Sequence, residues 1–203
     1  MVSDEAKQRM RAVAAHYPTL RSAILPALHI AQSEEGYLTQ DALESVAEAL
    51  RLNPDEVKSV ATFYTMFFKE QPGKRVIKVC TSISCYLRGC DQLMTHLEER
   101  LGIKRGETTP DGRFTLLTTE CLASCGTAPV LQVNDEFVEN VTPESADTLL
   151  KELNQEIDSG LPPRRQGQPN GAAATGNVGA RPAKSDKAGK PAKSAPASGK
   201  RSE

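Results

Sequence analysis

The chain contains no tryptophan, and aromatic residues make up only 4% of its 203 residues. Unpaired bases stack on aromatic side chains, so we expect no recognition of single-stranded nucleic acid and no specific nucleic-acid partner. No apolar run approaches the roughly 18 to 20 residues that a membrane-spanning helix requires. The segment Met1-Val-Ser-Asp-Glu lacks the basic start and the apolar core of a signal peptide, which predicts a protein kept in the reducing cytoplasm.

Several motifs of catalysis are missing as well. Residues 1–65 contain no paired carboxylates, no nucleophile placed with a base and no glycine-rich phosphate loop. Gly89, Gly102 and Gly126 each stand alone, so we find no dinucleotide fingerprint. The C-x-x-C motif, with which thiol–disulfide oxidoreductases lower the pKa of one thiol, is also absent. We therefore expect no catalytic residue on this chain.

What the sequence does contain is two close pairs of cysteines. Four residues separate Cys80 from Cys85, three separate Cys121 from Cys125, and 35 residues lie between the pairs. Each pair follows a short run typical of a strand, so each can occupy one tight loop. A fold that brings the two loops together would gather four thiolates around one small volume.

Four thiolates suit either a zinc ion or an iron–sulfur cluster. Structural zinc sites space paired ligands by about two to four residues, which both pairs satisfy, although zinc ribbons usually carry a tighter C-x2-C knuckle. A [2Fe–2S] cluster takes two ligands on each iron, and wider pairs accommodate it. Two disulfides are a further alternative, which a reducing compartment disfavours. The last alternative is that the cysteines are free and buried and act as small hydrophobes.

The fifth cysteine, Cys90, lies five residues after Cys85 and falls within an amphipathic segment predicted to be a helix, residues 87–101. We interpret it as a structural thiol. The preceding segment, Thr81–Ser84, is small and polar and is predicted to be a loop. Its backbone amides are candidates to donate hydrogen bonds to cluster sulfurs, which would raise the reduction potential.

Apolar periodicity predicts helices in the first third of the chain, over residues 4–16, 19–33 and 40–52 and from Pro54 onward. Pro26 lies inside the second of them, where a proline kinks or bends a helix. The predicted product is a small helical bundle, residues 1–70, that packs against a partner chain.

The middle of the chain predicts a β-α-β-β-α order. The predicted elements are strands at 75–79 and 114–119, the helix 87–101, a hairpin of 129–133 with 136–139, and a last helix over 143–157. From Leu161 to the end the chain carries nine Lys and Arg against two acidic residues, a net charge of +7, whereas residues 1–160 carry −8. Pro, Gly, Ala, Ser and Lys dominate residues 161–203, so we predict a disordered basic tail there.

Several separated motifs resemble one family. They are Val79-Cys-Thr-Ser-Ile-Ser-Cys-Tyr-Leu-Arg-Gly89, Leu101-Gly-Ile-Lys-Arg-Gly-Glu-Thr-Thr-Pro-Asp-Gly112, Glu120-Cys-Leu-Ala-Ser-Cys-Gly-Thr-Ala-Pro129 and Ala61-Thr-Phe-Tyr-Thr-Met-Phe67. Together these runs resemble the thioredoxin-like [2Fe–2S] subunit (the 24 kDa type) of respiratory NADH:quinone oxidoreductase. The resemblance covers about residues 10–160. It implies an α+β fold in which the helical bundle is followed by a thioredoxin-like [2Fe–2S] domain, residues 71–160.

The resemblance also implies the cofactor and the partners. Cys80, Cys85, Cys121 and Cys125 would ligate one [2Fe–2S] cluster, with the first pair on one iron and the second pair on the other, although the assignment of pairs to irons stays open. FMN and NAD would belong to a partner chain. The partners would be that FMN- and NADH-binding subunit and the large iron–sulfur subunit of the peripheral arm, in a hetero-oligomer at the cytoplasmic face of the inner membrane.

Three alternatives remain at this point. The same module occurs in NAD-linked hydrogenases and formate dehydrogenases, and the residues barely separate these from the respiratory complex. A structural zinc module without redox activity is the second. The third is a free-standing ferredoxin, which has no evident need of the helical residues 1–65.

Overall fold

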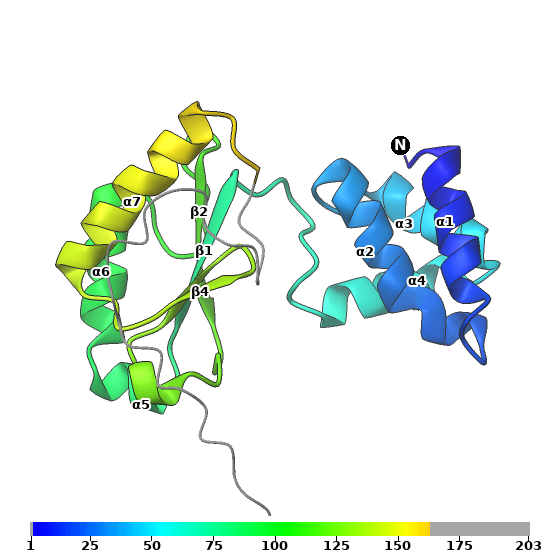
Figure 1. The fold of residues 1–203 in the computed structure, drawn as a ribbon. Helices are drawn as coiled ribbons and strands as arrows, with labels where there is room; N and C mark the ends of the chain where they lie inside the picture. The colour runs from blue at the N-terminus through cyan, green and yellow to red at the C-terminus, as the bar shows by residue number, and fades with distance from the viewer. Residues whose placement is uncertain (1, 163–203) are drawn as a thin grey trace, which may run out of the picture. The chain divides into compact units, whose positions relative to one another are not determined.

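The structure is a computed structural model that describes residues 2–162. The predicted disordered tail therefore lies outside the described residues, except for Leu161 and Pro162. The amino-terminal part contains four α-helices and one 3-10 turn (Figure 1): α1 (Asp4–Ala14), η1 (Leu20–Ala23), α2 (Ile24–Glu35), α3 (Gln40–Leu50) and α4 (Pro54–Phe63).

Polar side chains begin three of these helices. Ser3 accepts a hydrogen bond from an amide in the first turn of α1, and Thr39 and Asn53 do the same for α3 and α4. Such caps satisfy backbone donors that have no partner inside the helix. Helices that begin at Gln40 and at Pro54 were predicted from the sequence, and both starts are confirmed.

The predicted second helix is divided in two, and this division was not predicted. Residues Leu20–Ala23 form a 3-10 turn, and α2 begins only at Ile24. Pro26 thus lies in the first turn of α2, where the amide that proline lacks would have no helical partner. The proline is accommodated by the place at which the helix begins.

The apolar faces of α1 to α4 close on one core, with Met10, Ile24, Leu28 and Leu50 almost fully buried. Phe67, from the segment after α4, is buried in the same core.

That segment is fastened to α2 by one side chain. The carboxamide of Gln32 donates to the Met66 carbonyl at 3.0 Å and accepts from the Phe68 amide at 2.8 Å. The run 61–67, one of the motifs that resemble the family, thus contributes to the helical core.

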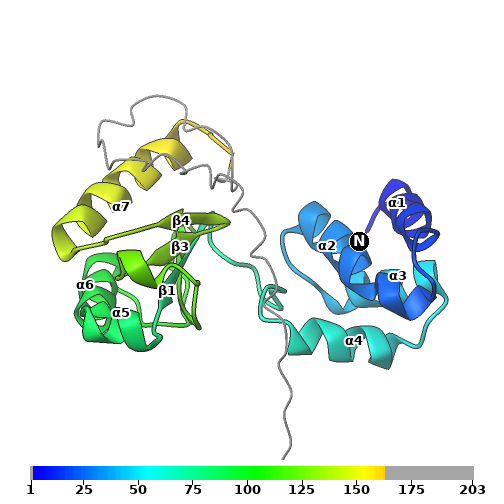
Figure 2. The same cartoon turned by 60° about the horizontal axis from the view of Figure 1, so that its bottom comes forward.

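The second part is a four-stranded sheet with helices (Figures 1 and 2). Its elements are β1 (Arg75–Cys80), α5 (Ile83–Leu87), α6 (Cys90–Leu101), β2 (Phe114–Thr119), η2 (Cys125–Thr127), β3 (Leu131–Val133), β4 (Glu136–Val138) and α7 (Pro143–Asp158). The strand order is β2-β1-β3-β4. β1 and β2 run parallel, while β3 is antiparallel to both β1 and β4.

One face of this sheet is apolar. Ile77 pairs with Leu116 on one side and with Val133 on the other, and all three are fully buried. In the next row, Lys78 and Gln132 are partly exposed, because side chains alternate between the two faces. The helices α6 and α7 pack against each other, and their apolar side chains complete the core over the buried face.

The predicted loop Thr81–Ser84 is wrong in its second half. Ile83 begins the short helix α5, which contains Cys85, and the predicted helix 87–101 begins only at Cys90, as α6. Gly89 separates α5 from α6 with a φ of +91°, a left-handed conformation that glycine adopts without strain. Cys85 is therefore held on a helix rather than in a loop.

A buried arginine joins the first strand of the sheet part to its last helix and to the segment that follows it. Arg75, the first residue of β1, is only 2% exposed and forms an ion pair with Glu156 of α7 at 3.6 Å. Its guanidinium also donates to the carbonyl of Leu161 at 3.1 Å. The two hydrophobic cores share no residue. The boundaries proposed for the helical bundle and the cluster domain stay a prediction.

The cap of α7 gives a prediction about stability. Thr142 accepts from the Ser145 amide, and Ser145 accepts from the Thr142 amide in return. Replacing Thr142 by alanine removes one acceptor and is expected to lower the free energy of unfolding by about 1 kcal/mol. Thr148→Ala, in the exposed middle of the same helix, is expected to change it by less than about 0.5 kcal/mol. Urea unfolding followed by circular dichroism measures both, and equal losses would contradict the capping role.

Candidate metal centre

The register of two parallel strands sets the position of the cysteine loops. Cys80 is the last residue of β1, and it pairs with Thr119, the last residue of β2. Parallel strands leave a sheet at the same edge, so the two following loops begin side by side. The Thr81 amide donates to the Thr119 carbonyl at 3.0 Å and ties the two loops together. Cys121 follows only two residues later.

The first pair, Cys80 and Cys85, is buried, with 3% and 2% of each residue exposed. Burial raises the pKa of the Cys85 thiol to about 11, and the neighbouring Cys80 sulfur adds to this rise. Burial also acts to raise the pKa of Cys80. The backbone amides of Leu122 and Ser82 and the Cys85 thiol outweigh it, so that this pKa is lowered. Within the pair, Cys80 therefore loses its proton at a lower pH than Cys85, and the Cys85 thiol donates a hydrogen bond to the Cys80 sulfur.

The second pair, Cys121 and Cys125, is exposed. Their Sγ atoms are 3.7 Å apart, and the Ala123 amide donates to the Cys121 Sγ at 3.3 Å. Ala123 adopts a φ of +60°, which a residue with a side chain takes up only at some cost in strain. The backbone of this loop is thus turned so that one of its amides faces a cysteine sulfur.

One backbone contact joins the two pairs. The amide of Leu122, which lies between Cys121 and Cys125, donates to the sulfur of Cys80. All five cysteines are free thiols, so neither of the two disulfides considered above forms. Within residues 2–162, no three His, Cys, Asp or Glu side chains gather closely enough for a single metal ion. The structure brings each predicted pair together and places the pairs beside each other.

Cys90 lies apart from this constellation. It is fully buried at the start of α6, in the core formed with Leu93 and Met94. Burial raises the pKa of its thiol, and the nearby Asp91 raises it further. A protonated thiol inside an apolar core agrees with the structural role predicted for this residue.

The sulfurs were predicted from the sequence, but most of their hydrogen-bond donors were missed. Ser82 belongs to the segment whose amides were predicted to donate, and it does so. The amides of Leu122 and Ala123 come from the second loop, and that of Val130, which donates to Cys85, comes from the chain ahead of β3. A backbone donor is present at every residue except proline, so no residue type marks it in a sequence.

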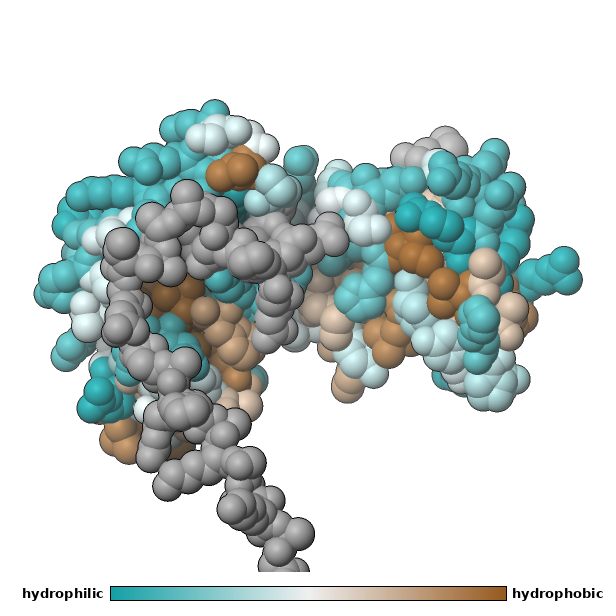
Figure 3. All heavy atoms as spheres, viewed as in Figure 1, coloured by the Kyte–Doolittle hydropathy of each residue, from teal (hydrophilic) through white to brown (hydrophobic). Residues whose placement is uncertain are grey.

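The surface around α5 is unusually apolar for a short exposed helix. Ile83, Tyr86 and Leu87 are 76%, 60% and 77% exposed. Figure 3 shows hydrophobic side chains at the lower left, over α5 as it lies in Figure 1.

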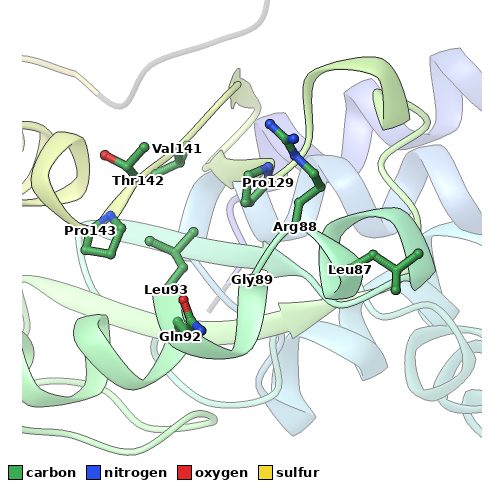
Figure 4. A pocket seen from close by; sticks show the side chains of 9 residues that line it. All are labelled: Leu87, Arg88, Gly89, Gln92, Leu93, Pro129, Val141, Thr142 and Pro143. Carbon is green, nitrogen blue, oxygen red and sulfur yellow. The ribbon is translucent and has the colours of Figure 1, made fainter.

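A pocket of about 450 Å³ opens beside this helix, between the α5–α6 junction and the start of α7. Figure 4 shows its lining: Leu87, Arg88, Gly89, Gln92, Leu93, Pro129, Val141, Thr142 and Pro143. Arg88 is the one ionisable group in this lining, and none of the cysteines contributes to it. In the described part of the chain, no helix combines the length and the apolarity needed to cross a bilayer.

The different burial of the pairs predicts their reactivity in iron-free protein. Iodoacetamide attacks thiolates that it can reach, so at pH 8 we expect Cys121 and Cys125 to be alkylated first. Cys85 and Cys90 are expected to react at least tenfold more slowly, because they are buried and their pKa values are raised. Peptide mass spectrometry over a time course measures each rate, and rapid labelling of Cys85 would contradict the described burial.

Comparison with known proteins agrees with this geometry. The chain is 48% identical over 145 residues to the second E-type subunit of NADH-quinone oxidoreductase from Rhizobium meliloti (strain 1021), covering 71% of this chain and 86% of that protein. It is 45% identical over 140 residues to the E-type subunit of NADH-quinone oxidoreductase from Mycobacterium bovis, covering 69% of this chain. The match spans 56% of the mycobacterial protein, which is therefore considerably longer than the shared segment.

Among solved structures, an NAD+-reducing [NiFe]-hydrogenase in the air-oxidized state matches with a TM-score of 0.59 and 27% sequence identity. This match covers 66% of the chain but only 23% of the hydrogenase chain. A family model described as "Thioredoxin-like [2Fe-2S] ferredoxin" matches residues 10–154, which include all four paired cysteines. The chain belongs to the thioredoxin-like [2Fe–2S] ferredoxin family.

Proposed function

We propose that Cys80, Cys85, Cys121 and Cys125 hold one [2Fe–2S] cluster, and that the chain carries electrons in an NADH:quinone oxidoreductase. The observation that carries this proposal is that the two loops that bear the thiol pairs begin side by side at one edge of the sheet, at the paired strand ends Cys80 and Thr119. Two thiolates bound at about 2.3 Å to one tetrahedral metal ion lie about 3.8 Å apart. The 3.7 Å between the sulfurs of Cys121 and Cys125 supports their binding to one iron. Cys80 and Cys85 would bind the other.

The chain's own residues set the environment of that centre. A bound [2Fe–2S] cluster supplies reversible one-electron chemistry. Amides from Ser82, Leu122 and Ala123 donate hydrogen bonds to cysteine sulfurs, and donors of this kind stabilise added negative charge. Cys80 and Cys85 lie inside the protein, whereas Cys121 and Cys125 face outward. Electrons would therefore pass most directly through the exposed loop.

The partners follow from the chemistry that this chain lacks. It has no dinucleotide fingerprint, so NADH would be oxidised by an FMN-bearing subunit that exchanges single electrons with the cluster. The 48% identity to an E-type subunit of NADH-quinone oxidoreductase supports this assignment. The large iron–sulfur subunit of the peripheral arm would be the second partner. The helices α1–α4, which contain no catalytic constellation, would pack against these chains at the cytoplasmic face of the inner membrane.

A second candidate is the electron-transfer module of an NAD-linked hydrogenase, with formate dehydrogenase as a further variant. The likeness to an NAD+-reducing [NiFe]-hydrogenase favours it, but the identity is 27% rather than 48%. Purification of the native complex separates the two. Hydrogen-dependent NAD+ reduction in the purified complex would support the hydrogenase, and NADH-dependent quinone reduction would support the respiratory complex.

The metal content of the full chain is the first test. Anaerobically purified protein is expected to contain about two irons and two acid-labile sulfides, because one [2Fe–2S] cluster contains two of each. Dithionite reduction should give the electron paramagnetic resonance signal of a reduced S = 1/2 centre. A content of one zinc, with no sulfide and no signal, would instead show that the chain is a structural zinc module and not an electron carrier.

Substitution tests the ligand set. Cys121→Ser is expected to lose the cluster or to alter its spectrum strongly, because serine replaces a thiolate on one iron. Cys90→Ser is the matched control, since it changes a cysteine that is buried away from both pairs. It is expected to leave the visible absorption and the paramagnetic resonance spectrum unchanged. Loss of the cluster in Cys90→Ser, with normal folding by circular dichroism, would show that the proposed ligand set is wrong.

A further inference from the structure

A hydroxyl network surrounds the last cysteine of the second pair. Ser124 immediately precedes Cys125, and Thr127 closes the 3-10 turn that Cys125 begins. The two hydroxyl oxygens are 2.9 Å apart, and the Thr127 hydroxyl also donates to the Ser124 carbonyl at 3.0 Å. The Thr127 amide donates to the same carbonyl at 3.1 Å. Cys125 thus lies within a turn whose two ends, Ser124 and Thr127, are bonded to each other, while its own side chain is exposed.

This network ends on one carboxylate. Glu139, the residue after β4, accepts a hydrogen bond from the Ser124 hydroxyl and interacts with the Thr127 hydroxyl. The hydrogen bond from Ser124, and then the proximity of the Thr127 hydroxyl, lower the pKa of this carboxyl, so it is ionised at neutral pH. The neighbouring Asn140 amide donates to the Thr127 carbonyl at 2.8 Å and fixes the backbone beside the carboxylate. The end of the β3–β4 hairpin therefore contacts the cysteine loop through Glu139 and Asn140.

We propose that Glu139 is the positioning residue of the second cysteine loop, and that its charge lowers the reduction potential of the bound centre. The inference rests on the proposed function and deepens it. Glu139 touches no cysteine and is not a ligand. It acts through Ser124 and Thr127, which lie on the two sides of Cys125.

The sign of the electrostatic effect follows from the charge of the electron. Reduction adds one negative charge to the cluster, and a carboxylate hydrogen-bonded to the residue beside a ligand opposes it. The amides of Leu122 and Ala123 act in the opposite direction, because they point positive dipoles at the sulfurs. Glu139 thus offsets part of the stabilisation that those donors give to the reduced state.

Two substitutions separate position from charge. Glu139→Gln keeps an oxygen that accepts from Ser124 but removes the charge, whereas Glu139→Ala removes both. Glu136→Gln is the matched control, because it removes one negative charge at the other end of β4, about 10 Å along the strand. The double variant Ser124→Ala with Thr127→Val removes the hydroxyls and keeps the charge.

Redox titration of the full chain, followed by paramagnetic resonance, measures the charge effect. In Glu139→Gln the equilibrium constant for reduction is expected to rise about threefold, which is about +28 mV at 59 mV per tenfold for one electron. Glu136→Gln should give less than half of this shift. Equal potentials in Glu139→Gln and the wild type would overturn the charge effect.

Chelator-driven loss of iron measures the positioning effect. Glu139→Ala and the double variant are expected to lose iron about fivefold faster than the wild type, since in each of them the hydrogen bond between Ser124 and residue 139 can no longer form. Glu139→Gln should lie close to the wild type. A wild-type rate in Glu139→Ala would overturn the positioning role.

Hydrogen exchange on iron-free protein gives a readout that does not need the cluster. The Thr127 amide should exchange faster in Glu139→Ala than in wild type and Glu136→Gln, because its turn has lost the carboxylate anchor. Unchanged exchange would also overturn the positioning role. A wild-type protein without iron and sulfide would overturn the proposed function and the charge effect, and the exchange measurement would still decide the positioning role.

Discussion

The parallel pairing of β1 with β2 determines where the four paired cysteines lie. A shift of the register by one residue would turn Cys80 to the other face of the sheet and carry it away from Leu122. The buried row that includes Ile77 and Leu116 holds this register, because a shift would expose it. The hydrophobic core and the candidate metal centre therefore depend on the same strand register, and the core enforces it.

The two cysteine pairs lie in different surroundings, one buried and one exposed. Cys80 and Cys85 are enclosed by protein, where water is excluded and the surrounding amides act at short range. Cys121 and Cys125 lie on an exposed loop, in which the Ser124 and Thr127 hydroxyls contact each other and Ser124 donates to the Glu139 carboxylate. A centre bound by both pairs would combine buried ligands on one side with access from outside on the other.

The sequence predicted most of the elements and the sulfurs because both have local signals. The caps Thr39 and Asn53, strong apolar periods and paired cysteines are each readable within about one turn or one strand. The helix that carries Cys85 was missed because its five residues are too few to show a period. The role of Glu139 could not be predicted, because it lies 14 residues after Cys125 and only the β3–β4 hairpin brings them together.

The contact of Arg75 with Leu161 has a consequence for how this module is joined to other chains. Arg75 opens the sheet part and Leu161 follows its last helix, so the segment begins and ends at one place. A segment with adjacent ends can be spliced into a longer polypeptide with little disturbance of its core. The buried Arg75 guanidinium thus holds the two ends of the sheet part together.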